Sequence, residues 1–151
     1  MSPTGARHGS LQSRLAAALI LMGETKGHGR TYTEVGIVLE RSPDHVVGPD
    51  TAFVMARSLP AGISSEGYLD TIPELVVAIR SKNDTNAEID EKVADYLKAG
   101  AQLVWAVDPE AETVAEHRPQ SRPRTLGTTD TLACDDIIPG FRLPLAELFR
   151  E

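Results

Sequence analysis

The chain has 151 residues, of which 41% are hydrophobic and 25% charged, and its formal net charge is −7. This length predicts a single domain over residues 1–151, and the acidic balance excludes a global attraction to nucleic acid or anionic membranes while allowing a local basic patch. The single cysteine, Cys134, excludes an internal disulfide framework. Without a signal-peptide pattern or a long apolar run, the sequence favours a cytoplasmic protein.

The first half of the chain is expected to contain a helix and two strands. Apolar residues recur at helical spacing over residues 10–23 and alternate with other residues over 31–40, as in a strand. A turn with two prolines over residues 41–49 leads to a second strand over 51–55. These strands are close enough in sequence to pair as a hairpin. Residues 57–71 are expected to form a surface connection.

The central segment, residues 73–109, has the pattern of a strand, a helix and a second strand. Glu74–Arg80 contains five consecutive apolar residues, which is typical of a strand buried on both faces. Thr85–Glu88 has the form of a capping box, and Gly100 suits the C-terminal cap of the helix. Leu103–Val107 forms the second buried strand. The segment therefore predicts a βαβ unit, with candidate chemistry where its first strand ends and its helix begins.

The C-terminal part is expected to complete the sheet. Residues 113–117 follow a turn and form a hairpin with the preceding strand, and residues 118–124 are a Pro-Arg loop. The tail from Ile137 to Phe149 has enough apolar residues to pack back on the core. The predicted fold class is α/β (α+β), with a central mixed sheet flanked by helices in the order α-β-β-β-α-β-β.

Three charged residues are candidates for chemistry, because the chain has no glycine-rich phosphate loop, paired metal-binding histidines or nucleophile elbow. Asp50 directly precedes a strand, where it would hold a hard cation such as Mg²⁺ or would be an ordinary turn aspartate. Lys92 flanks the buried stripe of the helix, where it would reach the strand ends or would pair with Glu88 on the helix surface. Glu34 would face Asp50 across the hairpin or be solvated.

Motifs along nearly the whole chain resemble those of one bacterial family. In the central segment they are Pro73–Val77, Ser81, Glu91–Lys92, Tyr96–Leu97, Ala99–Gly100, Val104–Trp105 and Val107–Pro109. Gly48–Val54 resembles the first acidic motif of that family, Ser2–Gly5 with His8 resembles the segment before its first core helix, and Ile138–Phe141 resembles its Leu-Pro-Gly-Phe ending. The chain thus resembles the Uma2 family, which is described as endonucleases of the restriction-endonuclease, or PD-(D/E)XK, fold.

The resemblance implies a Mg²⁺ site made of two carboxylates and a lysine, which serves to hydrolyse phosphodiester bonds. The first carboxylate corresponds to Asp50, and the lysine, on the helix, corresponds to Lys92. The second carboxylate corresponds to position 78, where this chain has Ala78. The site is therefore expected to be degenerate and to bind Mg²⁺ weakly. Arg80, on the same strand face, could contact phosphate but is too basic to act as a general base.

Other residues are candidates for supporting roles. Glu34 is the candidate second metal ligand, and either Glu34 or Glu88 could replace the missing carboxylate. His8, Ser81 and Tyr96 belong to the motifs that resemble the family, and we include them with Arg80 as possible supporting residues of the site.

Two functions follow from these residues. A Mg²⁺-dependent endonuclease with weakened activity toward DNA is favoured by Asp50 and Lys92, whereas an inactive relative that keeps the fold for binding or assembly is favoured by Ala78. The basic residues that could contact DNA phosphates are Arg7, Arg14, Arg80, Arg118, Arg122 and Arg124, although the last three could equally form a solvated turn. Uma2-like chains usually have a further segment ahead of the part where this sequence begins, so the chain is expected either to be naturally short or to have its start placed at an internal methionine. Uncovered ends of the sheet would favour a homodimer. No membrane partner is expected.

Overall fold

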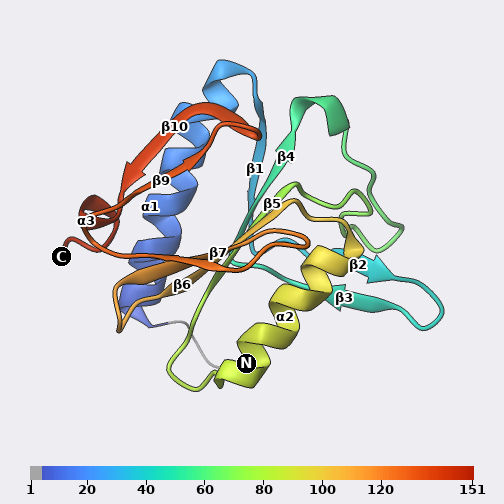
Figure 1. Cartoon of the computed structure of the whole chain (residues 1–151). Coiled ribbons are helices and arrows are strands. Elements are labelled where there is room, and N and C mark those ends of the chain that lie inside the picture. Colours follow the sequence, from blue (N-terminus) through green and yellow to red (C-terminus); the bar gives the residue numbers. More distant parts are fainter. Residues whose placement is uncertain (1–4) are drawn as a thin grey trace.

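A six-stranded mixed sheet lies at the centre of the computed structural model, which describes residues 5–151 (Figure 1). In spatial order the strands are β1 (Gly29–Thr33), β4 (Thr51–Met55), β5 (Leu75–Ile79), β6 (Leu103–Asp108), β7 (Thr113–His117) and β8 (Arg124–Leu126). Strands β5 and β6 are parallel, and every other neighbouring pair is antiparallel. Helix α2 (Asn86–Ala99) connects β5 to β6, which confirms the predicted βαβ unit.

The two faces of the sheet are covered by different elements (Figure 1). One face carries α1 (Ala6–Met22), the hairpin of β9 (Thr131–Cys134) and β10 (Ile138–Pro144), and the short helix α3 (Leu145–Leu148). The other face carries α2 and the hairpin of β2 (Ile37–Glu40) and β3 (His45–Val47). Short 3-10 helices follow α1 (Glu24–Lys26) and β4 (Ala56–Ser58).

Strand β5 is buried along its whole length because it contributes to both faces. Leu75, Val77 and Ile79 belong to the apolar cluster that contains α1, whereas Val76 belongs to the cluster that contains α2. Successive strand residues point to opposite faces, so Ala78 and Arg80 follow Val76 toward the α2 side. This is the side on which the predicted lysine of α2 lies.

Local signals fix the ends of α2. The Thr85 hydroxyl accepts a hydrogen bond from the Glu88 backbone N–H, and the Glu88 carboxylate accepts one from Thr85, which confirms the capping box. Gly100 ends the helix with φ of 123°, a conformation that glycine adopts without steric cost. By contrast, α1 begins at Ala6, four residues before the predicted start, and therefore includes His8.

The continuous strand predicted over residues 31–40 is wrong. Glu34 has a left-handed backbone with φ of 51°, and the chain leaves β1 there to begin β2 in a different sheet. Strand β3 occupies part of the predicted 41–49 turn. The pairing expected between the two flanking strands is present, since β1 and β4 are antiparallel, but the β2–β3 hairpin is inserted between them.

The tail packs back on the core as predicted. Phe141 of β10 is fully buried, and its ring centroid lies 5.6 Å from that of Trp105 in β6. The fold keeps the predicted order of elements, except that the strand predicted over residues 31–40 is divided into β1 and β2, and it adds the strands β3, β8, β9 and β10 and helix α3. Within residues 5–151, none of the helices combines the length and apolar character that crossing a membrane requires.

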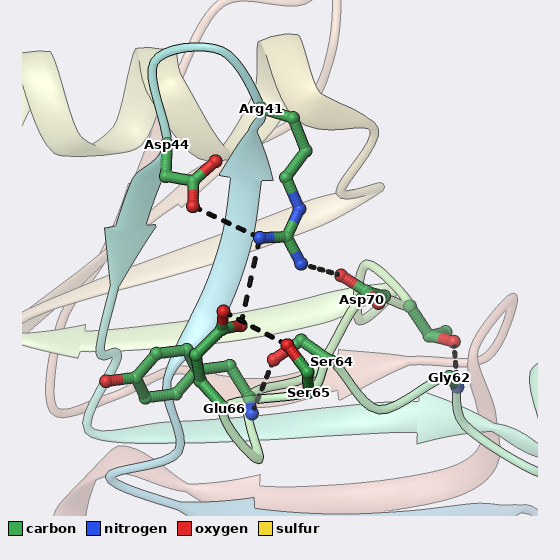
Figure 2. Close-up of polar contacts among 9 residues, drawn as sticks. Arg41, Asp44, Gly62, Ser64, Ser65, Glu66 and Asp70 are labelled. Atoms are coloured by element: carbon green, nitrogen blue, oxygen red, sulfur yellow. Dashed lines mark hydrogen bonds and ion pairs between the residues drawn. The ribbon is translucent and has the colours of Figure 1, made fainter.

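An exposed ionic cluster fastens the β2–β3 hairpin to the loop that follows β4 (Figure 2). The Arg41 guanidinium lies 3.2 Å from carboxylate oxygens of both Asp44 and Asp70 and 3.8 Å from one of Glu66. We call these four residues the Arg41 cluster. The hairpin it holds leads directly into Gly48 and Pro49, and so into Asp50.

Candidate active site

Asp50 is held at the start of β4 by contacts from three segments. Its Oδ2 accepts a hydrogen bond from the Ile79 N–H at 2.6 Å, and its Oδ1 lies 3.1 Å from His8 Nε2. Its backbone carbonyl accepts bonds from Gln12 Nε2 at 3.1 Å and from the Glu34 N–H at 3.2 Å. His8 and Gln12 are four residues apart on α1 and therefore share one face of that helix. Helix α1 thus contacts Asp50 at both its carboxylate and its backbone carbonyl.

The pKa of the Asp50 carboxyl is raised above its ordinary value. Burial is the largest cause, and the nearby Glu34 carboxylate adds to it. The Ile79 N–H, His8 and Lys92 all lower the pKa, but they do not outweigh burial. Asp50 is therefore a carboxylate whose charged form is disfavoured by its surroundings, which is more typical of a functional site than of a surface turn.

Asp50, Ala78 and Lys92 line the same cavity, which has a volume of about 270 Å³. Asp84 and Tyr96 line it as well, and burial together with Asp50 raises the pKa of the Tyr96 hydroxyl. Strands β4 and β5 supply one wall and α2 supplies the other. The three positions that the resemblance assigns to the site therefore line one cavity.

Lys92 does not form the helix-surface pair that was its alternative role. The Glu88 carboxylate accepts the Thr85 N–H at 3.2 Å, and no ion pair joins Glu88 to Lys92. The Lys92 side chain is exposed and borders the cavity. Its charge lowers the pKa of both Asp50 and Asp84, so its ammonium contributes to the electrostatics of this end of the sheet.

Asp84 and Gln12 were missed by the sequence reasoning. The Asp84 Oδ2 accepts hydrogen bonds from the Ser81 N–H and hydroxyl, each at 2.9 Å. Burial raises the pKa of Asp84, but the Ser81 bonds, Lys92 and Arg80 together outweigh it and lower the pKa. The three-residue spacing from Ser81 is a turn signal that could have placed Asp84.

A larger cavity, of about 1030 Å³, adjoins the first at Asp50. It is lined by the start of α1, the turn between β5 and α2, and residues 108–110. Arg80 lines it and donates to Asn86 Oδ1 and, at 3.0 Å, to the Asp84 carbonyl. Both acceptors are neutral, although the Arg80 charge also acts on the Asp84 carboxylate and lowers its pKa. Lys82 is exposed on the same turn.

Several predicted residues lie elsewhere. Glu34 and Glu88 are exposed and line neither cavity, although the Glu34 carboxylate is close enough to raise the pKa of Asp50. Arg7 borders the larger cavity but lies 3.5 Å from Glu112. Arg14 donates to the Leu148 carbonyl near the C-terminus.

The arginine loop, residues 118–124, lies at the opposite end of the sheet from Asp50. Strand β7 begins with Thr113 beside Asp108 and ends at His117 beside Val104. The loop therefore continues away from the strand ends that hold Asp50 and Ala78. Its residues line a separate cavity of about 280 Å³ with Glu116, which excludes them from the candidate site.

Comparison with known proteins identifies the family. The profile of the family described as "Uma2: Putative restriction endonuclease" matches residues 1–146. The chain belongs to the Uma2 family. The matched motif at Ser2–Thr4 lies outside the residues that the structure describes. None of the curated proteins compared with this chain matches it.

The fold of this Uma2 chain is shared with a solved structure. The crystal structure of "a putative nuclease belonging to DUF820" from Anabaena variabilis superposes with a TM-score of 0.82. The alignment covers 99% of this chain and 83% of that one at 20% sequence identity, a level at which the similarity shows the fold alone. The predicted α+β class with a mixed central sheet flanked by helices is thereby confirmed.

The residues of this Uma2 chain do not fit a Mg²⁺ ion held by protein carboxylates. Ala78 provides no side-chain oxygen, and Asp84 Oδ2 is engaged by Ser81. Both Asp50 oxygens already have partners, Ile79 and His8. Within residues 5–151, no three Asp, Glu, His or Cys side chains gather in a way that could hold a metal ion. Hard cations need several oxygen ligands, and these are not assembled here.

Proposed function

We propose that this Uma2 chain is a degenerate endonuclease, which binds DNA at the Asp50 end of its sheet and hydrolyses phosphodiester bonds with Mg²⁺ slowly or not at all. The observation that carries this proposal is the shared cavity of Asp50, Ala78 and Lys92. Membership of a family described as restriction endonucleases, and a nuclease-like fold, support the substrate class.

The chemistry explains why activity would be low. In metal-dependent hydrolysis, a divalent cation polarises the phosphate and lowers the pKa of the attacking water. Ala78 stands at the position aligned with the second carboxylate and removes one negative charge from the cation's surroundings. Lys92 still places an ammonium at the cavity, where it would stabilise the negative charge of a phosphate group. The chain thus retains a residue for phosphate while lacking ligands for the cation.

Contacts to DNA are expected from the turn between β5 and α2. Arg80 and Lys82 both line the larger cavity next to Asp50, and neither pairs with a carboxylate. With a net charge of −7, attraction to DNA must come from such a local group rather than from the whole surface. The homodimer expected from the sequence stays a prediction, and size-exclusion chromatography with light scattering would test it.

A catalytically silent DNA-binding protein is the second candidate. The observation that favours it is His8 on the Asp50 carboxylate, because an engaged Asp50 is less available to a cation. The two candidates differ in one measurable property, the dependence of any residual cleavage on Asp50.

Plasmid nicking with Mg²⁺ or Mn²⁺ tests the proposal. We expect the wild-type chain to nick supercoiled DNA at a slow rate that Asp50→Ala removes, and Ala78→Glu to raise that rate. The matched control is Ala78→Gln, which fills the same space without charge and should leave the rate unchanged. Robust wild-type cleavage that Asp50→Ala abolishes would overturn the degenerate site. A slow residual rate that depends on Asp50 favours the weak endonuclease over the silent protein.

A further inference from the structure

We infer that His8 occupies the Asp50 oxygen on which a divalent cation would bind, so that His8 as well as Ala78 keeps such cations out of the site. The inference concerns the site of the proposed function, but it is tested by metal binding without DNA. Its failure can therefore be told apart from a failure of the proposed endonuclease activity.

The contact is made at the one carboxylate oxygen that the backbone leaves open. Asp50 Oδ2 is committed to the Ile79 N–H at 2.6 Å, which leaves Oδ1 as the atom available to a ligand. His8 Nε2 lies 3.1 Å from that atom, within hydrogen-bond distance. A cation approaching Oδ1 would have to displace the imidazole or share the oxygen with it.

The position of His8 is set by the fold rather than by a flexible side chain. Its side chain is 14% exposed and that of Asp50 is 23% exposed, so the pair is largely sheltered from water. Helix α1 is anchored to the core by Leu11 and Leu15, and Gln12 binds the Asp50 backbone one turn beyond His8. These contacts fix the part of α1 that carries His8 beside Asp50.

The charges around Asp50 act in the same direction. Lys92 and His8 are both close enough to lower the pKa of Asp50, which means that each favours its charged form as a cation would. The neighbouring Asp84 carboxylate is bound by Ser81. These groups supply part of the favourable interaction that a bound cation would give the charged carboxylate, although burial still holds the pKa of Asp50 above its ordinary value.

Ala78 and His8 have separate roles in this inference, because Ala78 lacks a carboxylate oxygen and His8 contacts the carboxylate that is present. Restoring a carboxylate with Ala78→Glu supplies an oxygen, and the adjoining 270 Å³ cavity gives the longer side chain room. His8 would still engage Asp50 Oδ1 in that variant. Full cation binding should therefore require both Ala78→Glu and removal of the imidazole.

Calorimetric titration with Mn²⁺, at one fixed pH and without DNA, tests this. We expect His8→Ala combined with Ala78→Glu to bind Mn²⁺ about tenfold more tightly than Ala78→Glu alone, the lower end of what neighbours of a metal site contribute. The matched control is His28→Ala combined with Ala78→Glu, which removes an imidazole beside the far end of β4 from Asp50, and it should bind like Ala78→Glu. Equal or weaker binding by the His8→Ala double variant would overturn the inference.

A second measurement uses the wild-type chain and does not depend on how well His8→Ala folds. The ¹⁵N resonance of His8 Nε2 reports its contact with the Asp50 carboxylate. We expect this resonance to shift in Asp50→Ala and to stay unchanged when millimolar Mg²⁺ is added to the wild type. A saturating shift with Mg²⁺ in the wild type would show that the cation displaces the imidazole, and would contradict the inference.

Discussion

The two ends of the central sheet use buried carboxylates in opposite ways. At the end away from Asp50, Glu74 accepts the Met55 N–H at 2.8 Å and the Ser58 hydroxyl at 2.6 Å, and only 8% of its side chain is exposed. Glu116 is equally buried and accepts bonds from the Trp105 indole. At the other end, Asp50 borders two cavities, and burial raises its pKa.

The difference shows what distinguishes a structural carboxylate from a candidate functional one. Glu74 and Glu116 satisfy protein donors that would otherwise be buried without partners, so they stabilise the fold. Glu116 also borders a cavity, but Asp50 differs from it in being less favourably placed as an anion, because burial raises its pKa. Such unfavourable burial beside a cavity is typical of sites kept for function rather than for stability. Substitutions at each end of the sheet test this difference.

The largest effect is expected at the structural end, from Glu74→Ala. This change leaves the Met55 N–H and the Ser58 hydroxyl without their acceptor in a buried place. We expect the free energy of unfolding to fall by about 3 kcal/mol, since each unsatisfied buried group costs about 1–3 kcal/mol. Urea denaturation followed by circular dichroism measures this. Glu91→Ala, which changes an exposed residue, serves as the control. A urea midpoint of Glu74→Ala equal to that of the wild type would show that Glu74 does not stabilise this end of the sheet.

The next largest effect concerns DNA binding at the Asp50 end. Arg80→Ala removes a charge that lines the large cavity and is paired only with neutral acceptors. We expect the affinity for a labelled duplex to fall about tenfold, with a shallower dependence on salt. Arg122→Ala, at the opposite end of the sheet, is the matched control and should bind normally. Fluorescence anisotropy measures both affinities. Weaker binding by Arg122→Ala than by Arg80→Ala would place the DNA-binding surface at the arginine loop.

Much of the Asp50 end could be predicted because its signals are local. The apolar run of β5, the capping box at Thr85 and the Pro49–Asp50 turn each specify their own geometry within a few residues. Once β5 and α2 form a βαβ unit, Ala78 and Lys92 lie on the same side of the sheet. The pairing of β4 with β5 then places Asp50 beside the end of β5. The convergence of these residues is therefore a consequence of patterns visible in the sequence.

The remaining features depend on contacts between distant segments. Gln12 and Asp50 are 38 residues apart, and nothing in the helical pattern of α1 indicates that its start reaches the strand ends. The break at Glu34 was missed because alternation continues through it, and the sharp turn is stabilised by its N–H on the Asp50 carbonyl. Tertiary hydrogen bonds of this kind override a periodic pattern without leaving a local signal.

A smaller effect, of opposite sign to that of Glu74→Ala, is expected from Asp50→Asn. The amide keeps an acceptor for the Ile79 N–H and removes a charge whose burial is unfavourable, so the variant should be more stable than the wild type at neutral pH. The pKa of Asp50 in the folded chain lies above its ordinary value of 3.8, so the folded chain binds this proton more tightly than the unfolded one. Stability of the wild type relative to Asp50→Asn should therefore fall as the pH rises above 3.8.

Thermal unfolding of both proteins between acidic and neutral pH checks this sign. A wild type that becomes more stable than Asp50→Asn as the pH rises would mean that pairing with His8 outweighs burial. In that case Asp50 would resemble Glu74, and the contrast between the two ends of the sheet would be lost.

The smallest effect is expected from Arg41→Ala, although the Arg41 guanidinium lies near three carboxylates (Figure 2). Its side chain is 45% exposed, and exposed ion pairs are screened by water and salt and lose side-chain entropy when they form. We expect an unfolding midpoint close to that of the wild type, with any difference vanishing at high salt, and unchanged DNA affinity. A large salt-independent loss would instead mean that the β2–β3 hairpin, through Gly48 and Pro49, determines the position of Asp50. Measuring Mn²⁺ affinity of Arg41→Ala in the Ala78→Glu background would then show whether the hairpin belongs to the site.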